Sequence, residues 1–186
     1  MKTRHSTNTQ ASPCLGNLIG TVRAAARSRA SWAETADLVA DQLRLHLPGP
    51  EILTAGQRYG DPAGYCCHLL HAEPDGSFSV TALVWRPGQA TTIHDHVTWC
   101  VAGVIQGAEH EERYTLRADG WLEQEQASVN GTGDVTGLAP PGDIHRVSNA
   151  GAETAISLHI YGTDISRLGN SVRRTYDLPV VTRMPD

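Results

Sequence analysis

The chain between about residue 60 and residue 161 is cut into short apolar runs by turn-forming glycine, proline, asparagine and aspartate residues. Short runs broken at this spacing are typical of the strands of an all-β sandwich or barrel. The 186 residues include 18 glycines and 10 prolines but a single phenylalanine, which favours many short strands over a helical bundle. We therefore expect a β-sandwich or β-barrel to form the body of the protein.

The individual strands can be placed from the turn residues between them. Pro74-Asp75-Gly76 and Asp119-Gly120 read as hairpin turns, and residues 130–133 read as a loop. We expect strands over residues 64–72, 78–85, 91–96, 99–105, 109–116, 121–129, 134–138, 145–149 and 154–161.

Two helices are expected before the strands. The first is expected over residues 15–29. Ser31 and Glu34 have the spacing of a capping box and predict the start of the second helix, which the Pro48-Gly49-Pro50 segment ends. Side chains spaced three and four residues apart would share one face of that helix, namely Trp32, Ala36, Val39, Leu43 and Leu47.

These patterns divide the chain into four parts. We expect a disordered tail over residues 1–13, a helical segment over 14–50, the barrel over 51–165, and a C-terminal tail over 166–186 that packs back on the barrel.

Composition excludes several classes of function. The formal net charge of −5 provides no basic field for nucleic acid, and no basic stretch or helix-turn-helix pattern suggests a DNA-binding regulator. Apolar runs are too short to span a membrane, and residues 1–10 lack the apolar segment of a secretory signal. The four cysteines have neither zinc-knuckle nor CxxC spacing, which favours free thiols in a reducing compartment. We expect a cytoplasmic protein, with its oligomeric state left open.

Three histidines form the strongest candidate for chemistry. His94 and His96 are two residues apart, so in a strand both imidazoles point to the same face and can reach one metal ion. A second cluster runs from Pro140 through Gly142 and His145 to Asn149. Alternatively, the first two histidines could be an unrelated surface pair, and His145 could cap a turn.

These two clusters resemble the two motifs of the cupin superfamily, and the resemblance covers most of residues 60–162. It implies an all-β, jelly-roll-like double-stranded β-helix barrel, here preceded by the N-terminal helices, with His94, His96 and His145 as metal ligands. Cys100 stands where many cupins have a glutamate ligand.

Two further segments indicate which family within the cupin superfamily this sequence resembles. The string PGQATTIHDH, with Trp85 upstream, is similar to the metal-binding strand of the cysteine dioxygenases and related thiol dioxygenases. In that family a serine, a histidine and a tyrosine form a hydrogen-bonded set beside the iron, and Ser157, His159 and Tyr161 match them. Alternate strand positions put these three side chains on one face. The plainer alternative is a barrel-lining tyrosine beside a packed neutral histidine.

The resemblance implies Fe(II) as the cofactor, with a small thiol and O2 as substrates. Three neutral imidazoles leave a divalent ion its full charge, and an incoming thiolate can supply the negative charge that a carboxylate ligand would otherwise provide. The product of L-cysteine would be a sulfinate. Alternatives are a 3-mercaptopropionate dioxygenase, an oxygenase that converts cysteine into a rearranged sulfur–nitrogen product, and a metal-binding cupin sensor without catalysis. A passive binder has no use for the Ser157, His159 and Tyr161 set.

Cys100 matches the cysteine that in animal cysteine dioxygenases is joined covalently to the active-site tyrosine, although one residue is missing between His96 and Cys100. A thioether between Cys100 and Tyr161 is therefore one hypothesis. A small buried thiol that only fills space is the other, and metal ligation by Cys100 is a third.

Substrate contacts are less well marked. Tyr65 and Cys67 lie in the segment that resembles the substrate-binding strand of the family, and Cys67 replaces its carboxylate-binding arginine or glutamine. Arg173, or its neighbour Arg174, is expected to take over that role from the C-terminal tail. Asp95 faces away from the two histidines that flank it, and we expect it to be a structural hydrogen-bond acceptor.

Overall fold

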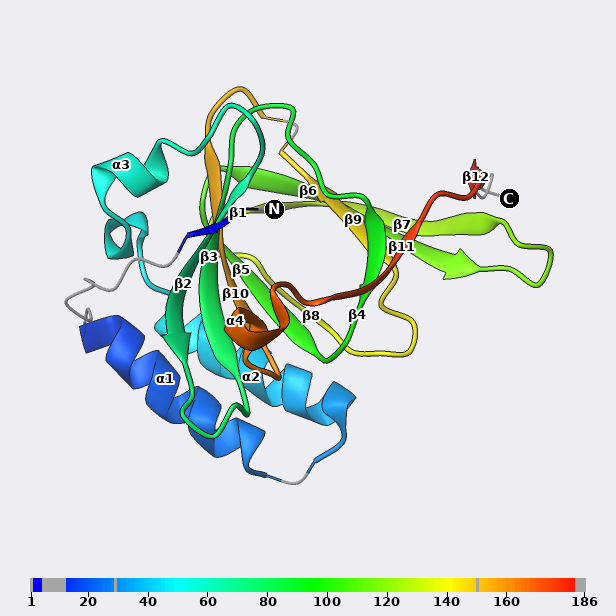
Figure 1. The fold of residues 1–186 in the computed structure, drawn as a ribbon. Helices are drawn as coiled ribbons and strands as arrows, with labels where there is room; N and C mark the ends of the chain where they lie inside the picture. Colours follow the sequence, from blue (N-terminus) through cyan, green and yellow to red (C-terminus); the bar gives the residue numbers. More distant parts are fainter. Residues whose placement is uncertain (1, 5–12, 29, 150, 183–186) are drawn as a thin grey trace.

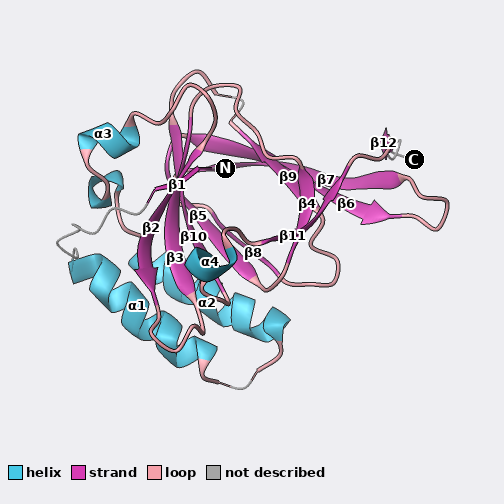
Figure 2. Ribbon diagram, viewed as in Figure 1, coloured by secondary structure: helices cyan, strands magenta, loops and turns pink. Residues whose placement is uncertain are grey.

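The computed structural model describes residues 2–4, 13–28, 30–149 and 151–182. Two six-stranded sheets form a barrel, and the longer helices lie along the outer side of one sheet (Figure 1, Figure 2). The helices are α1 (Pro13–Ala26), α2 (Trp32–His46), the 3-10 helix η1 (Pro50–Ile52), α3 (Ala55–Arg58) and α4 (Ile165–Leu168). The strands are β1 (Lys2–Arg4), β2 (Cys66–Ala72), β3 (Ser79–Trp85), β4 (Ile93–His96), β5 (Cys100–Gln106), β6 (Ala108–Leu116), β7 (Leu122–Gly131), β8 (Val135–Leu138), β9 (His145–Ser148), β10 (Ala155–Tyr161), β11 (Val172–Tyr176) and β12 (Val180–Thr182).

The strand order is β1-β2-β3-β10-β5-β8 in the first sheet and β11-β4-β9-β6-β7-β12 in the second. Strands distant in sequence are therefore neighbours: β10 lies between β3 and β5, and β9 lies between β4 and β6. This is the barrel with N-terminal helices that the cupin resemblance implies, and the fold expectation is confirmed.

The first sheet has two buried faces. Apolar side chains of β3 and β10 pack outward against α1 and α2, where they meet Leu18, Val22, Val39 and Leu43. Alternate residues of β10 face inward, into the barrel. Because both faces of the strand are covered, every residue of β10 is buried. The inward positions of β10 are Ser157, His159 and Tyr161, which places polar groups on the inner wall of the barrel.

The second helix begins as its sequence predicts and buries most of the predicted face. Ser31 accepts a hydrogen bond from the Glu34 backbone, and the Glu34 side chain accepts one from the Ser31 backbone, which completes the capping box. Ala36, Val39 and Leu43 are buried, but Trp32 is 49% exposed, so its assignment to the buried face is wrong. Trp32 is the first residue of α2.

Both ends of the chain add strands to the sheets. Lys2–Arg4 pairs in parallel with β2 and Pro13 begins α1, although we expected disorder there; residues 1 and 5–12 lie outside the described part. The C-terminal segment pairs with β4 through β11 and with β7 through β12. Strand β7 also continues through Gly131, into the segment that we expected to be a loop.

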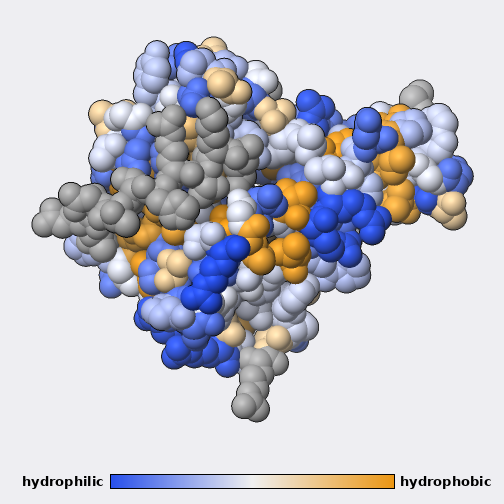
Figure 3. Space-filling model, viewed as in Figure 1, coloured by the Kyte–Doolittle hydropathy of each residue, from blue (hydrophilic) through white to orange (hydrophobic). Residues whose placement is uncertain are grey.

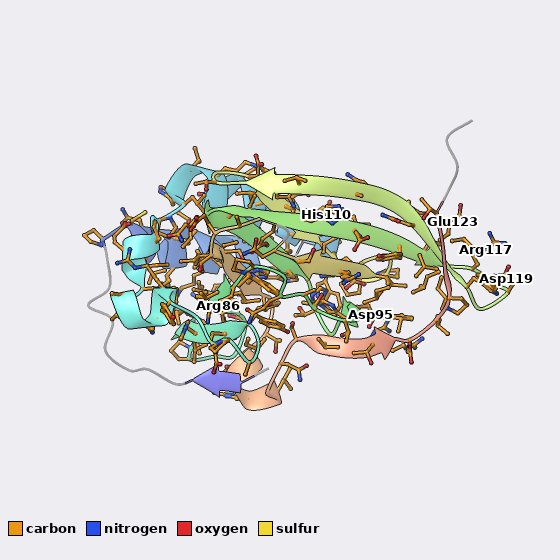
Figure 4. All side chains as sticks on the ribbon, turned by 90° about the horizontal axis from the view of Figure 1, so that it is seen from above. Arg86, Asp95, His110, Arg117, Asp119 and Glu123 are labelled. Atoms are coloured by element: carbon orange, nitrogen blue, oxygen red, sulfur yellow. The ribbon has the colours of Figure 1, made fainter. Side chains whose placement is uncertain are left out.

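The β6–β7 hairpin projects from the barrel as an arm (Figure 1). Arg117, which bridges to Asp119 and Glu123, lies at its tip (Figure 4). Hydrophobic surface is visible along the arm (Figure 3), where Trp121 and Val180 are exposed. None of the helices in the described ranges is sufficiently long and apolar to span a membrane.

Candidate metal centre

Three imidazoles converge inside the barrel. His94 and His96 come from β4, and His145 comes from β9, where it lies directly opposite His94. The ring centroids are 4.7 to 5.0 Å apart, and one ligand atom from each ring lies within 4.8 Å of the others. All three side chains are buried. The register of β4 against β9 therefore brings together the three histidines that the sequence predicts as metal ligands.

Each imidazole is oriented by an acceptor at its Nδ1 atom. Nδ1 of His94 lies 2.9 Å from the carbonyl oxygen of Thr92, and Nδ1 of His96 lies 3.0 Å from Asp143 Oδ2. Nδ1 of His145 lies 2.9 Å from Glu111 Oε1. Carbonyl and ionised carboxylate oxygens only accept, so each Nδ1 must carry the hydrogen. The lone pair of every ring is therefore on Nε2, which is left to bind a metal ion.

Burial keeps the His94 and His145 rings neutral, and hydrogen bonding keeps the Glu111 and Asp143 carboxylates ionised. Burial lowers the pKa of His94 to about 3, and burial also lowers the pKa of His145. Burial alone would raise the pKa of Glu111, but the hydrogen bond from His145 and the neighbouring Arg113 guanidinium hold it at about 2. The pKa of Asp143 is likewise lowered by its hydrogen bonds to His96 despite burial. Neutral imidazoles oriented by carboxylates are the donor set that divalent transition metals prefer.

A hydrogen-bonded chain lies beside the three histidines. His159 Nε2 is 2.9 Å from Ser157 Oγ, and His159 Nδ1 is 3.3 Å from the Tyr161 hydroxyl. Trp85 Nε1 donates to Ser157 Oγ at 3.2 Å. The Tyr161 ring lies 6.3 Å from the His96 ring, between centroids, so the chain ends next to the cluster. Burial lowers the pKa of His159 to about 3 and raises the pKa of Tyr161 well above its usual value.

Cys100 lies opposite Tyr161 in the pairing of β5 with β10. Its Sγ atom is 3.9 Å from His159 Nδ1, and the thiol is buried in the same apolar cluster as Tyr161. Burial raises the pKa of Cys100 far above its usual value, so the side chain is a neutral thiol. The structure thus makes Cys100 and Tyr161 neighbours, and the thioether stays a prediction.

Tyr65 and Cys67 contact the same inner region. Tyr65 stacks on Trp85 with ring centroids 4.4 Å apart, and it packs on the cluster that contains Cys67 and Tyr161. Burial raises the pKa of Cys67 to about 11. Tyr65 also lines a cavity of about 440 Å³ together with Asp61 and Gln89. Both residues are therefore placed beside the Ser157, His159 and Tyr161 chain.

Arg173 is not brought to the cluster. Its guanidinium binds the carboxylate of Asp95, which also accepts a hydrogen bond of 2.8 Å from the Tyr176 hydroxyl. Asp95 lies on the face of β4 opposite the ligand histidines, beside β11 (Figure 4). Arg174 instead lies over the Tyr176 ring at 5.6 Å. The structural role expected of Asp95 matches these contacts, whereas neither arginine is positioned to hold a substrate in the barrel.

Three buried acidic residues around the site were missed by the sequence reasoning. Glu109 and Glu111 face the barrel interior from β6, and Asp143 precedes β9. Trp85, noted only as part of the family resemblance, donates to Ser157. The sequence does contain one indication, because Glu109 and Glu111 are two residues apart in a predicted strand and therefore share a face. Charged residues are so frequent on exposed strand faces that this alternation does not by itself distinguish a buried pair.

The residues fit a divalent metal. The three Nε2 lone pairs converge from one side, and each ring is fixed by a hydrogen bond at its other nitrogen. Three ligands on one face leave further coordination positions open, as in mononuclear non-haem iron sites.

Comparison with solved structures finds similar proteins at low sequence identity, among them two that are described as cupins. A Thermus thermophilus protein is 19% identical, with a TM-score of 0.46, over 60% of this chain and 96% of that chain. A cupin superfamily protein from Desulfitobacterium hafniense is 13% identical, with a TM-score of 0.44, over 61% of this chain and 86% of that one. A cupin barrel domain protein from Salinispora arenicola is 21% identical, with a TM-score of 0.41, over 55% of this chain and 78% of that one.

Comparison with protein families gives a more specific result. The family described as cysteine dioxygenase type I matches residues 57–171, which span the barrel from before β2 to the start of the C-terminal strands. The matched region contains the three histidines and the Ser157, His159 and Tyr161 chain. Because the match extends over more than half of the sequence, this chain belongs to the cysteine dioxygenase type I family.

Proposed function

We propose that this protein is a thiol dioxygenase that holds Fe(II) on His94, His96 and His145 and oxidises the sulfur of L-cysteine, or of a close small thiol, to a sulfinate with O2. The observation that carries the proposal is the position of the Tyr161 hydroxyl, which ends a buried hydrogen-bonded chain next to three converging imidazoles. Membership of the cysteine dioxygenase type I family supports a metal-dependent oxidoreductase.

The three histidines hold the metal from one side of the barrel. Bound Fe(II) would supply the chemistry that couples a thiol with O2, and the balance is one thiol plus one O2 giving one sulfinic acid. Glu111 and Asp143 fix the orientation of two of the imidazoles and increase their basicity. The ligand set is thereby organised before substrate binds.

Tyr161 holds a proton at its hydroxyl oxygen. Because burial raises its pKa well above the usual value, the side chain stays a neutral phenol at physiological pH. A neutral phenol can donate a hydrogen bond to a substrate atom that carries negative charge. His159 and Ser157 position this hydroxyl from behind, through contacts of 3.3 and 2.9 Å.

Tyr65 and Cys67 form part of the wall that the substrate would meet. The cavity beside Tyr65 is also lined by Gln89 and Asp61, and none of the described residues that line it is lysine or arginine. The Gln89 amide donates to the Asp61 carbonyl oxygen and accepts from the Arg86 backbone. Because this cavity has no cationic side chain for a substrate carboxylate, formation of a rearranged sulfur–nitrogen product and oxidation of 3-mercaptopropionate are the second candidates.

The test is oxygen consumption by the purified chain loaded anaerobically with Fe(II). L-cysteine, 3-mercaptopropionate and cysteamine are supplied separately, and products are identified by mass spectrometry after turnover under ¹⁸O2. We expect consumption with L-cysteine and a sulfinate that carries two labelled oxygen atoms. A labelled product lacking a sulfinate would favour the rearrangement. No consumption with any thiol, by a protein that retains the metal, would contradict the proposal.

A further inference from the structure

A carboxyl group that the proposed mechanism does not use lies behind the Ser157 and His159 pair. Glu109 faces the barrel interior from β6 and is 4% exposed. Its Oε1 atom is buried and has no hydrogen-bond partner among the described residues. Glu109 lines a small cavity of about 20 Å³ together with Cys100, His145 and His159. A buried, unpartnered carboxyl oxygen requires an explanation in structure or function.

The neighbours of Glu109 connect it to the hydrogen-bonded chain. Ser157 and Trp85 interact with its carboxyl and oppose the effect of burial on its pKa. Trp85 Nε1 can only donate, and it donates to Ser157 Oγ. The single hydroxyl hydrogen of Ser157 can go to His159 Nε2, which lies 2.9 Å away, or to the neighbouring Glu109 carboxyl, but not to both.

The hydrogen bonds from Glu109 through Ser157 and His159 to Tyr161 can therefore all point in either of two directions. When Glu109 is protonated, it can donate to Ser157, Ser157 donates to His159 Nε2, and the hydrogen on His159 Nδ1 is donated to the Tyr161 oxygen. The Tyr161 hydrogen is then free for the metal side of the barrel. When Glu109 is ionised, Ser157 donates to it, His159 carries its hydrogen on Nε2, and Tyr161 donates inward to Nδ1. Neutral histidine allows both arrangements because each of its nitrogens can be donor or acceptor.

The surroundings place the protonation of Glu109 in the physiological range. Burial raises its pKa to about 7, with Ser157 lowering it and the nearby Glu111 charge raising it further. The other titratable groups facing this cavity are Cys100, His145 and His159, from β5, β9 and β10. None of the described lining residues is lysine or arginine, so no cation holds Glu109 in the ionised form.

We propose that Glu109 is a positioning residue whose proton sets the tautomer of His159 and, through it, whether the Tyr161 hydroxyl donates toward the metal or away from it. The catalytic consequence rests on the proposed thiol dioxygenase function, but the tautomer switch does not.

The direct test uses the full chain loaded with diamagnetic Zn(II) and labelled with ¹⁵N in its histidines. Long-range ¹H–¹⁵N spectra show which nitrogen of His159 is protonated, from about pH 5 to pH 9. We expect the hydrogen to be on Nδ1 below about pH 7 and on Nε2 above it. The Glu109→Gln variant should show a His159 tautomer that does not change with pH, because an amide has no proton to gain or lose in this range. Glu112→Gln is the control, because Glu112 lies on the other face of β6 beside Arg146.

A single His159 tautomer in the wild-type protein over the whole range would overturn the proposal, whether or not any variant folds. So would a Glu109→Gln variant that titrates like wild type. In turnover assays of the Fe(II) enzyme, the ratio of Glu109→Gln to wild-type kcat should rise by up to about tenfold per pH unit above pH 7. Absence of turnover with an intact tautomer switch would contradict the proposed function and leave this inference standing. If both enzymes turn over and the ratio of Glu109→Gln to wild-type kcat does not change with pH, the link from Glu109 to Tyr161 is overturned.

Discussion

The carboxylate of Glu111 accepts a hydrogen bond of 2.9 Å from Nδ1 of His145, and the two side chains meet inside the barrel from the neighbouring strands β6 and β9. Because this carboxylate keeps its charge at a pKa of about 2, it fixes both the tautomer and the orientation of the His145 ring. The metal site therefore extends beyond its three histidines, to a strand that contributes no ligand.

The first prediction concerns this pair. Glu111→Gln should weaken metal binding by about 10- to 100-fold, because an amide can donate to Nδ1 and so favour the wrong tautomer of His145. Competition with a chelator of known affinity measures the change. Glu112→Gln is the matched control, and it should bind metal as the wild type does. Equal affinities of the Glu111 and Glu112 variants would contradict the role of the hydrogen bond.

The second prediction concerns the ligands themselves. His94→Ala should abolish stoichiometric metal binding, because two imidazoles remain where three converge. Added Zn(II) should raise the Tm of the wild type in a concentration-dependent way and leave the Tm of the variant unchanged. The control is His110→Ala, on the outward side of β6, which should respond like the wild type. A variant that still binds one equivalent of metal would show that the ligand set is different.

The third prediction concerns acid stability of the metal-free protein. In the unfolded chain His159 takes up a proton near pH 6.5, whereas burial delays this to about pH 3 in the folded protein. Between these values the unfolded state binds more protons, so this histidine makes the free energy of unfolding fall as the pH falls. The slope is up to about 1.4 kcal/mol per pH unit. Above pH 6.5 its contribution is constant.

Urea unfolding of the wild type and His159→Asn, in the presence of a chelator, measures this effect. The difference in free energy of unfolding between them should shrink as the pH is lowered from about 7 to about 4. Glu109 contributes in the opposite direction, since its pKa is raised to about 7, but that contribution is common to both proteins. A difference that does not change with pH would mean that His159 is not held neutral by the fold.

The fourth prediction separates metal binding from chemistry. Tyr161→Phe should bind metal like the wild type but lower kcat for thiol oxidation by about 100-fold or more, because it removes the hydroxyl that donates beside the cluster. Tyr114→Phe, a buried tyrosine in a separate apolar cluster, is the control. Unchanged kcat in the Tyr161 variant would leave the hydrogen-bonded chain without a catalytic role.

The sequence could predict the parts of the site that depend on strand alternation. His94 and His96 share a face because they are two residues apart, and Ser157, His159 and Tyr161 share one for the same reason. The periodicity of a single strand contains this information, and it needs no knowledge of which strand is the neighbour.

The parts that the sequence could not predict depend on how strands are paired. Glu111 reaches His145 because β6 lies beside β9 in one particular register. Arg173 binds Asp95 because β11 pairs with β4 and the register shifts between Val172 and Arg174. Local patterns do not determine the register between strands far apart in the chain, so the arginine was expected at the substrate and was found on the other face of β4.

The fifth prediction concerns the pair formed by Cys100 and Tyr161. They lie opposite each other on β5 and β10, and both are buried in one cluster, so the strand pairing brings the two side chains together. Joining Sγ to the tyrosine ring removes two hydrogen atoms, which would be transferred to O2 during turnover. After repeated turnover with Fe(II), cysteine and O2, we expect a fraction of the intact protein to lose the mass of two hydrogens. Digestion should then yield a peptide pair joined through Cys100 and Tyr161. Cys100→Ser should show neither signal, and Cys14→Ser, in α1 away from the barrel interior, should show both. Wild-type protein that has turned over repeatedly and yields only unlinked peptides would leave Cys100 as a buried, neutral thiol that packs against His159.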